Sequence, residues 1–182
     1  MAVSALEALA ERAATASGPL PVRKWNPPDC GPIDIAIDRD GRWWHEGRPI
    51  AREGLVRLFS RVLRREPDGG YALVTPVEKV AIRVDDVPFV AVEMAAEGDG
   101  AAQRLGFLTN IGEFVTAGPE HKLRFEVDPR RGDVVPYLTV REGIEARLHR
   151  SLLFPLVECG MTESGTFGVW SDGCFFPIGA MP

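Results

Sequence analysis

The sequence predicts a mainly β fold of the α+β class, built from two related units that each combine a helix with an antiparallel sheet. Short apolar or alternating segments, separated by turn residues, occupy most of the stretch between residues 33 and 138. Amphipathic helix patterns interrupt these segments. The chain of 182 residues also matches itself at an offset of 89, close to half its length, which favours a duplicated unit.

A short helix and a proline-rich connector are expected over residues 1–32. Ser4-Ala5-Leu6-Glu7 is a capping box, in which the hydroxyl and the carboxylate satisfy the first free N–H groups of a helix. Residues 17–32 hold five of the 15 prolines. This composition predicts an extended segment that lies on a surface and outside any sheet.

The first unit is expected at residues 33–95. Isoleucines alternate with polar or small residues over 33–37, and Asp40-Gly41 is typical of a hairpin turn into residues 42–45. Apolar residues then recur at helical spacing, which predicts a helix over 51–65. The opposite face of this helix is predicted to carry a basic stripe of Arg57, Arg61, Arg64 and Arg65.

A series of strands follows the first helix and continues into the second unit, which is expected at residues 96–182. The predicted strands are 71–75, 79–84, 89–95, 103–109, 114–116, 123–127 and 134–138. Thr139-Val140-Arg141-Glu142 is a second capping box, and it predicts a helix that Pro155 ends. Residues 166–170 and 174–178 are expected to form a closing hairpin around Asp172-Gly173.

The internal match connects these two predicted helices. Arg52-Glu53-Gly54-Leu55 corresponds to Arg141-Glu142-Gly143-Ile144, and identical or similar residues recur further on. We therefore expect two similar units, each of which packs one helix on a small sheet.

Composition and charge exclude several classes of function. The formal net charge of −5 argues against a nucleic-acid partner. No apolar run approaches the roughly 20 residues of a membrane-spanning helix, so no membrane insertion is expected. The first residues lack the basic start of a signal peptide, and the three cysteines are widely spaced. The cytoplasm is therefore the expected compartment.

Familiar catalytic and cofactor motifs are missing from the sequence. It contains no phosphate-binding loop, no dinucleotide fingerprint and no GxSxG nucleophile elbow. His45, His121 and His149 lack the spacing of a zinc site. We expect no metal and no cofactor, and we assign no catalytic residue.

Tryptophans near the connector give the first group of candidate ligand-binding residues. Trp43 and Trp44 are neighbours on a predicted strand, so their side chains point to opposite faces and one of them needs cover from the connector or from a ligand. An indole beside polar side chains is typical of the wall of a binding cleft. This group comprises Trp25, Asn26, Cys30, Asp34, Arg42, Trp43 and Trp44, and Arg52 is added to it.

The segment Thr75-Pro76-Val77-Glu78-Lys79 gives the second group. A proline within a strand pattern indicates an edge or a bulge, which can direct Thr75, Glu78 and Lys79 at a ligand. A local ion pair between Glu78 and Lys79 is the alternative.

Several of these segments together resemble the DUF1285 family of bacterial proteins. They are Trp25-Asn26-Pro27-Pro28-Asp29-Cys30-Gly31-Pro32-Ile33-Asp34, Asp40-Gly41-Arg42-Trp43, Gly47-Arg48-Pro49-Ile50, Leu55-Val56-Arg57-Leu58-Phe59, Tyr71 to Lys79, and Val87-Pro88-Phe89. The resemblance extends from about residue 22 to the end of the chain. It implies an α+β fold of two related units and a role in signal transduction, and it carries no catalytic assignment.

Three functions follow from these observations. The first is a cytoplasmic binding or signalling module that takes a small ligand or a protein segment in a cleft between the units. The second is a small hydrolase or transferase with Asp34, Asp40 or Glu78 as general base, since paired carboxylates need no motif. The third is an assembly role, in which exposed aromatic residues form a homodimer face.

Overall fold

The protein folds into two compact units. The computed structural model describes residues 4–13 and 18–180. The N-terminal unit comprises Ser17–Phe89, and the C-terminal unit combines Met1–Ala16 with Val90–Pro182. This division falls at residue 89, before the boundary after residue 95 that the sequence suggests, and it assigns the first helix to the C-terminal unit.

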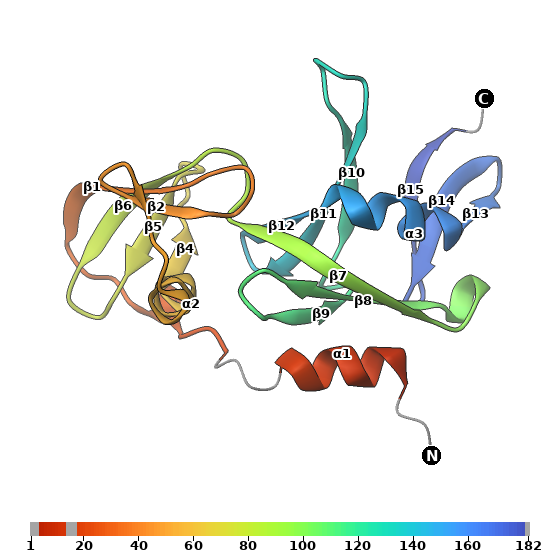
Figure 1. The fold of residues 1–182 in the computed structure, drawn as a ribbon, viewed down its shortest axis with the longest axis horizontal. Coiled ribbons are helices and arrows are strands. Elements are labelled where there is room, and N and C mark those ends of the chain that lie inside the picture. The colour runs from red at the N-terminus through yellow and green to blue at the C-terminus, as the bar shows by residue number, and fades with distance from the viewer. Residues whose placement is uncertain (1–3, 14–17, 181–182) are drawn as a thin grey trace. The chain divides into compact units, whose positions relative to one another are not determined.

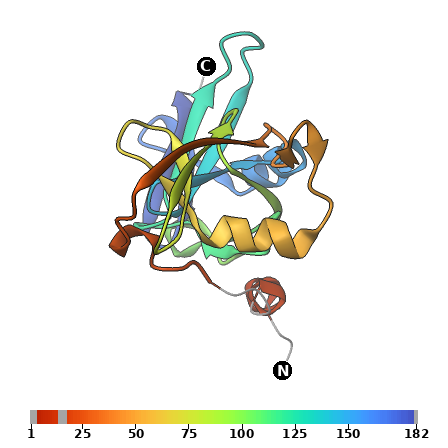
Figure 2. The same cartoon turned by 90° about the vertical axis from the view of Figure 1, so that its left-hand side faces the viewer.

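The N-terminal unit is a six-stranded sheet with one helix. Its strands are β1 (Asp29–Ile37), β2 (Trp43–His45), β3 (Arg48–Pro49), β4 (Leu63–Arg65), β5 (Tyr71–Val74) and β6 (Lys79–Val84). They follow the order β3-β2-β1-β6-β5-β4. Figure 2 looks onto this unit, where α2 (Glu53–Arg61) runs along one side of the curved strands. The predicted hairpin at Asp40-Gly41 is confirmed, because β1 and β2 pair in antiparallel orientation.

The prediction that the whole connector lies outside a sheet is wrong for its last residues. A short 3₁₀ helix (Val22–Lys24) begins the segment, but β1 already starts at Asp29. Asp29 aligns with Lys79 and Pro32 with Ala81 in a parallel pairing with β6. Proline tolerates this position because register shifts on both sides of Pro32 interrupt the regular ladder.

The helix predicted over residues 51–65 is shorter than expected. The α2 helix ends at Arg61, and residues 63–65 form β4. Val62 is its C-cap, and the Val62 carbonyl accepts a hydrogen bond from the Val74 N–H at 2.9 Å, which redirects the chain into the sheet. The prediction of a basic stripe on one helix face is therefore wrong, because Arg64 and Arg65 lie on the strand β4.

The C-terminal unit contains two sheets. One follows the order β10-β11-β12-β7-β8-β9 and the other the order β13-β14-β15. The first comprises β7 (Phe89–Glu97), β8 (Arg104–Thr109), β9 (Phe114–Thr116), β10 (Leu123–Val127), β11 (Val134–Arg141) and β12 (Ile144–Leu148). The second comprises β13 (Gly160–Glu163), β14 (Thr166–Ser171) and β15 (Cys174–Ala180). One short 3₁₀ helix (Gly100–Ala102) connects β7 to β8, and another (Arg150–Leu152) follows β12 and leads directly into α3 (Leu153–Glu158) (Figure 1).

The N-terminal helix is confirmed as α1 (Ala5–Ala13), and it starts with the predicted capping box. Ser4 Oγ accepts a hydrogen bond from the Glu7 N–H at 3.1 Å, and Glu7 Oε2 accepts one from the Ser4 N–H at 2.9 Å. Leu6 and Leu9 are buried, which places the apolar stripe of the helix in the core of this unit.

The second predicted capping box does not open a helix. Residues 139–141 continue β11, and a turn at Glu142-Gly143 leads into β12. The helix of this region is α3 (Leu153–Glu158), where Pro155 lies in the first turn, a position that needs no intrahelical N–H bond. The match at an offset of 89 thus aligns α2 with the strand β12, so it does not identify equivalent elements.

The predicted fold class is nevertheless confirmed. The chain is mostly β, and each unit combines a helix with a curled sheet. The parallel pairing of β1 with β6 departs from the antiparallel pairing of β1 with β2 and of β5 with β6 in the same sheet. No helix in the described ranges, 4–13 and 18–180, is long and apolar enough to cross a membrane.

Candidate functional site

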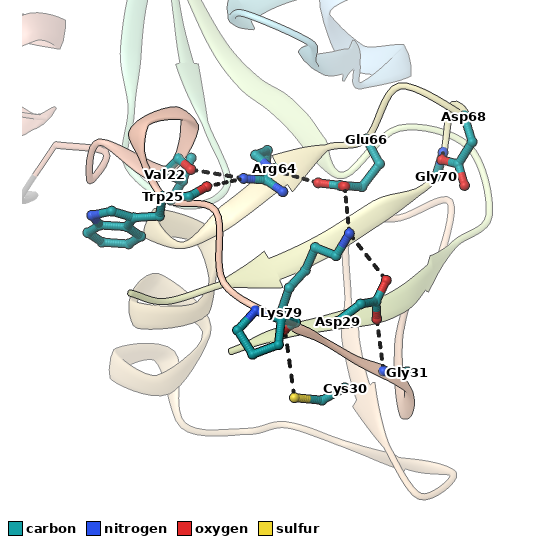
Figure 3. Close-up of polar contacts among 11 residues, drawn as sticks. Val22, Trp25, Asp29, Cys30, Gly31, Arg64, Glu66, Asp68, Gly70 and Lys79 are labelled. Carbon is teal, nitrogen blue, oxygen red and sulfur yellow. Dashed lines mark hydrogen bonds and ion pairs between the residues drawn. The ribbon is translucent and has the colours of Figure 1, made fainter. Parts of the chain in front are cut away.

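Four charged side chains of the N-terminal unit form a continuous network (Figure 3). Lys79 begins β6 and lies opposite Asp29 on the parallel strand β1. Lys79 Nζ lies 3.2 Å from Asp29 Oδ2 and 3.2 Å from Glu66 Oε2. Arg64 on β4 donates from Nε to Glu66 Oε1 at 2.5 Å, so the Glu66 carboxylate contacts both cations.

Arg64 also attaches the connector to the sheet. Its Nη1 donates to the Val22 carbonyl at 3.1 Å and to the Trp25 carbonyl at 2.9 Å. Figure 3 shows the guanidinium between these carbonyls and Glu66. The network therefore joins the connector, β1, β4 and β6.

The electrostatics of this cluster stabilise its charged forms. Hydrogen bonding from Arg64 lowers the pKa of Glu66, and the Lys79 ammonium adds to that effect. Hydrogen bonds to Glu66 and Asp29 raise the pKa of Lys79. The Lys79 side chain is thus held as an ammonium with two carboxylate partners, which is the opposite of what a nucleophilic or basic lysine needs. We interpret the cluster as a structural clamp.

The other candidates of the connector lie around this clamp. Trp25 is half-buried and contributes its carbonyl, whereas Asn26 and Cys30 are exposed. The Cys30 thiol lies 3.8 Å from the Pro28 carbonyl oxygen. The Pro28 carbonyl also accepts the Lys79 N–H at 3.1 Å, so Cys30 and Lys79 contact the same carbonyl, whereas Trp25 joins the clamp through Arg64.

The hairpin tryptophans differ in their environments. Trp43 is 2% exposed and stacks on Phe59 of α2, with ring centroids 6.0 Å apart. Trp44 is half-buried and donates from Nε1 to Asp38 Oδ2 at 2.9 Å. Trp43 is therefore a core residue, and Trp44 stabilises the turn.

The remaining candidates are spread over separate elements of the N-terminal unit. Asp34 lies on β1, Arg42 lies in the hairpin turn and Arg52 is the N-cap of α2, and all three side chains are exposed. Arg42 Nη1 lies 3.7 Å from Asp40 Oδ2. Glu78 is exposed in the turn between β5 and β6, where Thr75 Oγ1 accepts its N–H at 3.2 Å. Lys79 pairs with Glu66 and Asp29, so the alternative of a local Glu78–Lys79 pair is wrong.

A pocket lies in the C-terminal unit, in a region that the sequence did not single out. It is open to one side and has a volume of about 550 Å³. We call it the His121 pocket. Its lining residues are Phe114, Val115, Thr116, Gly118, Pro119, Glu120, His121 and Asp172.

Buried polar residues hold the two sides of the His121 pocket together. Ser171 is fully buried, and its Oγ accepts the Leu105 N–H at 2.9 Å and donates to the Ala117 carbonyl at 2.7 Å. The next residue, Asp172, donates its N–H to the carbonyl of the buried Gln103 at 3.0 Å. The turn between β14 and β15 is thereby fixed against β8 and the end of β9.

The close approach of Asp172 requires a glycine on the other side. A Cβ at Gly118 would lie 3.0 Å from Asp172 Oδ2, so the missing side chain leaves room for the carboxylate. Asp172 and Gly173 have φ values of 48° and 74°, which suit a type I′ hairpin turn. The hairpin turn therefore positions the backbone of Asp172, and Gly118 leaves room for its carboxylate.

The imidazole of His121 has a defined hydrogen-bonding role. Its Nδ1 lies 3.0 Å from the Thr139 carbonyl oxygen. A carbonyl only accepts hydrogen bonds, so Nδ1 carries a proton, and in the tautomer with a single ring proton Nε2 is an acceptor. The polar side chains that line the His121 pocket are thus the carboxylates of Glu120 and Asp172, the Thr116 hydroxyl and this imidazole.

Neither region holds an evident metal site. Within residues 4–13 and 18–180, no group of three or more His, Cys, Asp or Glu side chains is arranged to bind a metal ion. Sequence reasoning predicted the Asp172-Gly173 turn at one edge of the His121 pocket as a hairpin, but not as part of a site. It missed the other edge, because residues 114–121 carry no motif and reach Asp172 only through tertiary packing.

Comparison with models of protein families shows the family to which this chain belongs. Residues 20–87 match the N-terminal domain of DUF1285, a domain of unknown function, and residues 88–178 match the C-terminal domain of DUF1285, a protein of unknown function. The chain belongs to the DUF1285 family. The predicted resemblance is thus confirmed, and the DUF1285 domain boundary falls close to the division between the two units.

Solved structures of DUF1285 proteins agree with this assignment. A DUF1285 family protein from Silicibacter pomeroyi DSS-3 is 46% identical, covers 95% of both chains and superposes with a TM-score of 0.87. One from Shewanella baltica OS155 is 24% identical, covers 69% of this chain and 91% of its own, and has a TM-score of 0.53, which supports the fold alone. No curated protein matches this chain.

Proposed function

We propose that this DUF1285 protein is a non-catalytic binding module that takes a small ligand in the His121 pocket. The observation that supports the proposal best is the pocket itself, since it combines a volume of about 550 Å³ with several acceptor groups. Ligand sites in proteins are concave, with apolar walls and a few placed polar groups. Phe114 and Pro119 supply such walls.

The enzyme hypothesis receives little support from the carboxylates on which it depends. Asp34, Asp40 and Glu78 are exposed and belong to a strand, a hairpin turn and a different turn of the N-terminal unit. A general base needs to lie within hydrogen-bonding reach of the proton that it removes, in a site that holds the substrate. Their scatter over the surface favours a binding role for the protein.

The biological role that we propose is signalling through ligand occupancy, in the cytoplasm. Cys30, Cys159 and Cys174 are free thiols, which suits a reducing compartment. Ligand binding to a module without catalytic groups can act only through a change in its stability or its contacts.

A thermal-shift screen tests the proposed binding function. Any compound that binds only the folded state raises the melting temperature by mass action. The panel contains amines, carboxylates, sugars and nucleotides. We expect at least one compound to stabilise the wild type, and we expect the stabilisation to be lost in Gly118→Ala, whose Cβ would displace Asp172.

Gly179→Ala is the matched control for that substitution. A Cβ at Gly179, on β15 of the same unit, meets nothing within 4 Å. It should therefore respond to ligand as the wild type does. A panel without any stabilising compound, or equal stabilisation of Gly118→Ala and the wild type, would contradict the proposal.

Self-association is a second candidate, and one surface of the C-terminal unit favours it. Phe154 and Val157 on α3 are 72% and 49% exposed, and Met161 on β13 is 38% exposed. Exposed apolar side chains at neighbouring positions are typical of a protein interface, and we propose a second copy of the chain as its partner. Light scattering over a range of concentrations tests this candidate. We expect the wild type to form a dimer that Phe154→Ser weakens. A wild type that stays monomeric at every concentration, or a dimer that Phe154→Ser leaves unchanged, would contradict it.

A further inference from the structure

We propose that the ligand of the His121 pocket is an organic cation, a primary amine with an apolar body. This inference rests on the proposed binding function and adds the chemical class of the ligand. It depends on three properties of the pocket: the sign of its charges, the hydrogen-bonding character of its polar atoms and the nature of its walls.

The charges that line the pocket are negative. The eight lining residues include Glu120 and Asp172 and contain no lysine or arginine. Both carboxylates are exposed side chains on separate turns, Glu120 in the turn after β9 and Asp172 in the turn between β14 and β15. An ammonium group in the pocket is attracted by these carboxylates and can form a charge-assisted hydrogen bond with one of them, whereas an anion is repelled.

The neutral polar atoms of the pocket also favour a hydrogen-bond donor as ligand. Because Nδ1 of His121 is engaged by the Thr139 carbonyl, Nε2 is the ring atom left to accept. Thr116 lines the pocket beside it, and its hydroxyl can accept as well as donate. A primary ammonium carries three N–H donors, which suits a site rich in acceptors.

The walls suit an apolar body next to the ammonium group. Phe114 and Thr116 alternate with the buried Val115 on β9, so their side chains lie on the same face of the strand. The ring of Phe114 packs closely over Gly106, where an added Cβ would lie 2.7 Å from Phe114 Cε2. This packing holds the ring in place as an aromatic wall, and an aromatic face attracts cations.

The site is held in shape before any ligand binds. The two hydrogen bonds of Ser171 join β8, the segment after β9 and β14, and they lie in the buried interior. The hairpin turn then determines the backbone position of Asp172, and Gly118 leaves room for its carboxylate. Groups held in place by the fold reduce the ordering cost of binding.

Isothermal titration calorimetry on the full chain with three matched probes tests the ligand class. Phenethylamine, phenethyl alcohol and phenylacetate share an aromatic body and differ in charge. We expect phenethylamine to bind, the alcohol to bind at least about tenfold more weakly, since one charge-assisted hydrogen bond is worth that factor, and phenylacetate not to bind. Equal or tighter binding of the alcohol or of phenylacetate overturns the inference, as does the absence of phenethylamine binding.

Two carboxylate variants locate the binding in the pocket. Asp172→Asn keeps the shape of the side chain and tolerates the left-handed φ of 48°, so the hairpin turn is preserved. We expect it to weaken phenethylamine binding at least about tenfold. Glu163→Gln removes an exposed carboxylate from β13 of the same unit and should leave the affinity unchanged. Equal affinity of Asp172→Asn and the wild type contradicts the assignment.

The same data separate failure of this inference from failure of the proposed function. If phenylacetate or the alcohol binds at least as tightly as phenethylamine, and this binding is lost in Gly118→Ala, the inference of a cationic ligand is wrong but the proposed binding function still holds. If phenethylamine does not bind and no compound of the thermal-shift panel stabilises the protein, both the inference of a cationic ligand and the proposed binding function are wrong.

Discussion

Lys79 Nζ lies 3.2 Å from Glu66 Oε2, although a glutamate directly precedes Lys79 in the sequence. The contact spans the sheet, because Glu66 follows β4 whereas Lys79 begins β6, with β5 between them. The carboxylate that pairs with Lys79 is therefore selected by strand order and not by proximity along the chain. The exposed fraction of the Glu66 side chain is only 14%, and that of Arg64 is 15%, so this pairing bears on stability.

Removal of the Glu66 charge is predicted to destabilise the N-terminal unit. Glu66→Gln takes a carboxylate away from Arg64 and Lys79, which are left with fewer acceptors in a largely buried setting. The expected loss is on the order of 1–3 kcal/mol in the free energy of unfolding. Urea unfolding followed by circular dichroism measures it.

Glu78→Gln is the matched control for Glu66→Gln. Glu78 is an exposed glutamate of the same unit that lies beside Lys79 in sequence. Its substitution should change stability by less than about 0.5 kcal/mol. If the two variants lost the same stability, the clamp would not have the structural role described above.

The clamp also predicts a loss of stability in acid. The pKa of Glu66 is lowered in the folded protein, chiefly by the hydrogen bond from Arg64. The stability that ionised Glu66 contributes is therefore fully present above the pKa of a glutamate in the unfolded chain, about 4.3. This stability is lost as the pH falls through the lower pKa that Glu66 has in the folded protein. Unfolding curves recorded between neutral pH and pH of about 3 should show a smaller acid dependence for Glu66→Gln than for the wild type.

A carboxyl titration by NMR checks the sign of this effect directly. The pKa of the Glu66 side chain should lie below the ordinary value of a glutamate. Glu113 provides the opposite case, since burial raises its pKa even with the Arg141 guanidinium nearby. Titration of Glu66 at or above the ordinary value would disagree with the pairing seen in the structure.

Ser171 is predicted to be more important for stability than its small size suggests. Ser171→Ala leaves the Leu105 N–H and the Ala117 carbonyl without their buried partner. The expected cost is about 1–3 kcal/mol. Ser151→Ala, at an exposed serine of the same unit that contacts His149, should cost less than about 1 kcal/mol in the same denaturation experiment.

Gly106 is predicted to be required for the packing of α1. A Cβ at this position would overlap Leu6 Cδ2 and lie 2.7 Å from the Phe114 ring. Gly106→Ala should therefore lower the melting temperature and increase hydrogen exchange at the amides of α1. Gly179→Ala has open space around the added Cβ and should leave both quantities unchanged. Unaltered exchange in Gly106→Ala would contradict the packing of Leu6, on α1, against Gly106, on β8.

Local patterns predicted much of the fold correctly. The capping box at Ser4 and Glu7, the Asp40-Gly41 hairpin and most strand positions depend on contacts between residues close in sequence. The errors arise where tertiary contacts override such patterns. The hydrogen bond from Val74 to Val62 places residues 63–65 in the sheet, and residues 139–142 follow the pairing of β11 with β12 despite their capping-box sequence.

The candidate site was less predictable for a similar reason. Lys79 was identified as a polar residue of interest, but its partners Asp29 and Glu66 are brought to it by strand pairing. The His121 pocket brings Gly118 and Asp172 together across 54 residues of sequence, as the bond between Ser171 and Ala117 shows. No periodicity or motif in the sequence records such a contact.

Chemical-shift mapping tests most directly whether the His121 pocket is the binding site of the protein. Amide resonances of the ¹⁵N-labelled full chain are followed while phenethylamine is added. The predicted result is a saturable change confined to residues 114–121 and to Asp172 and its neighbours. Changes centred on Asp29, Glu66 and Lys79, or no saturable change at all, would contradict the assignment of ligand binding to this pocket and of a structural role to the clamp.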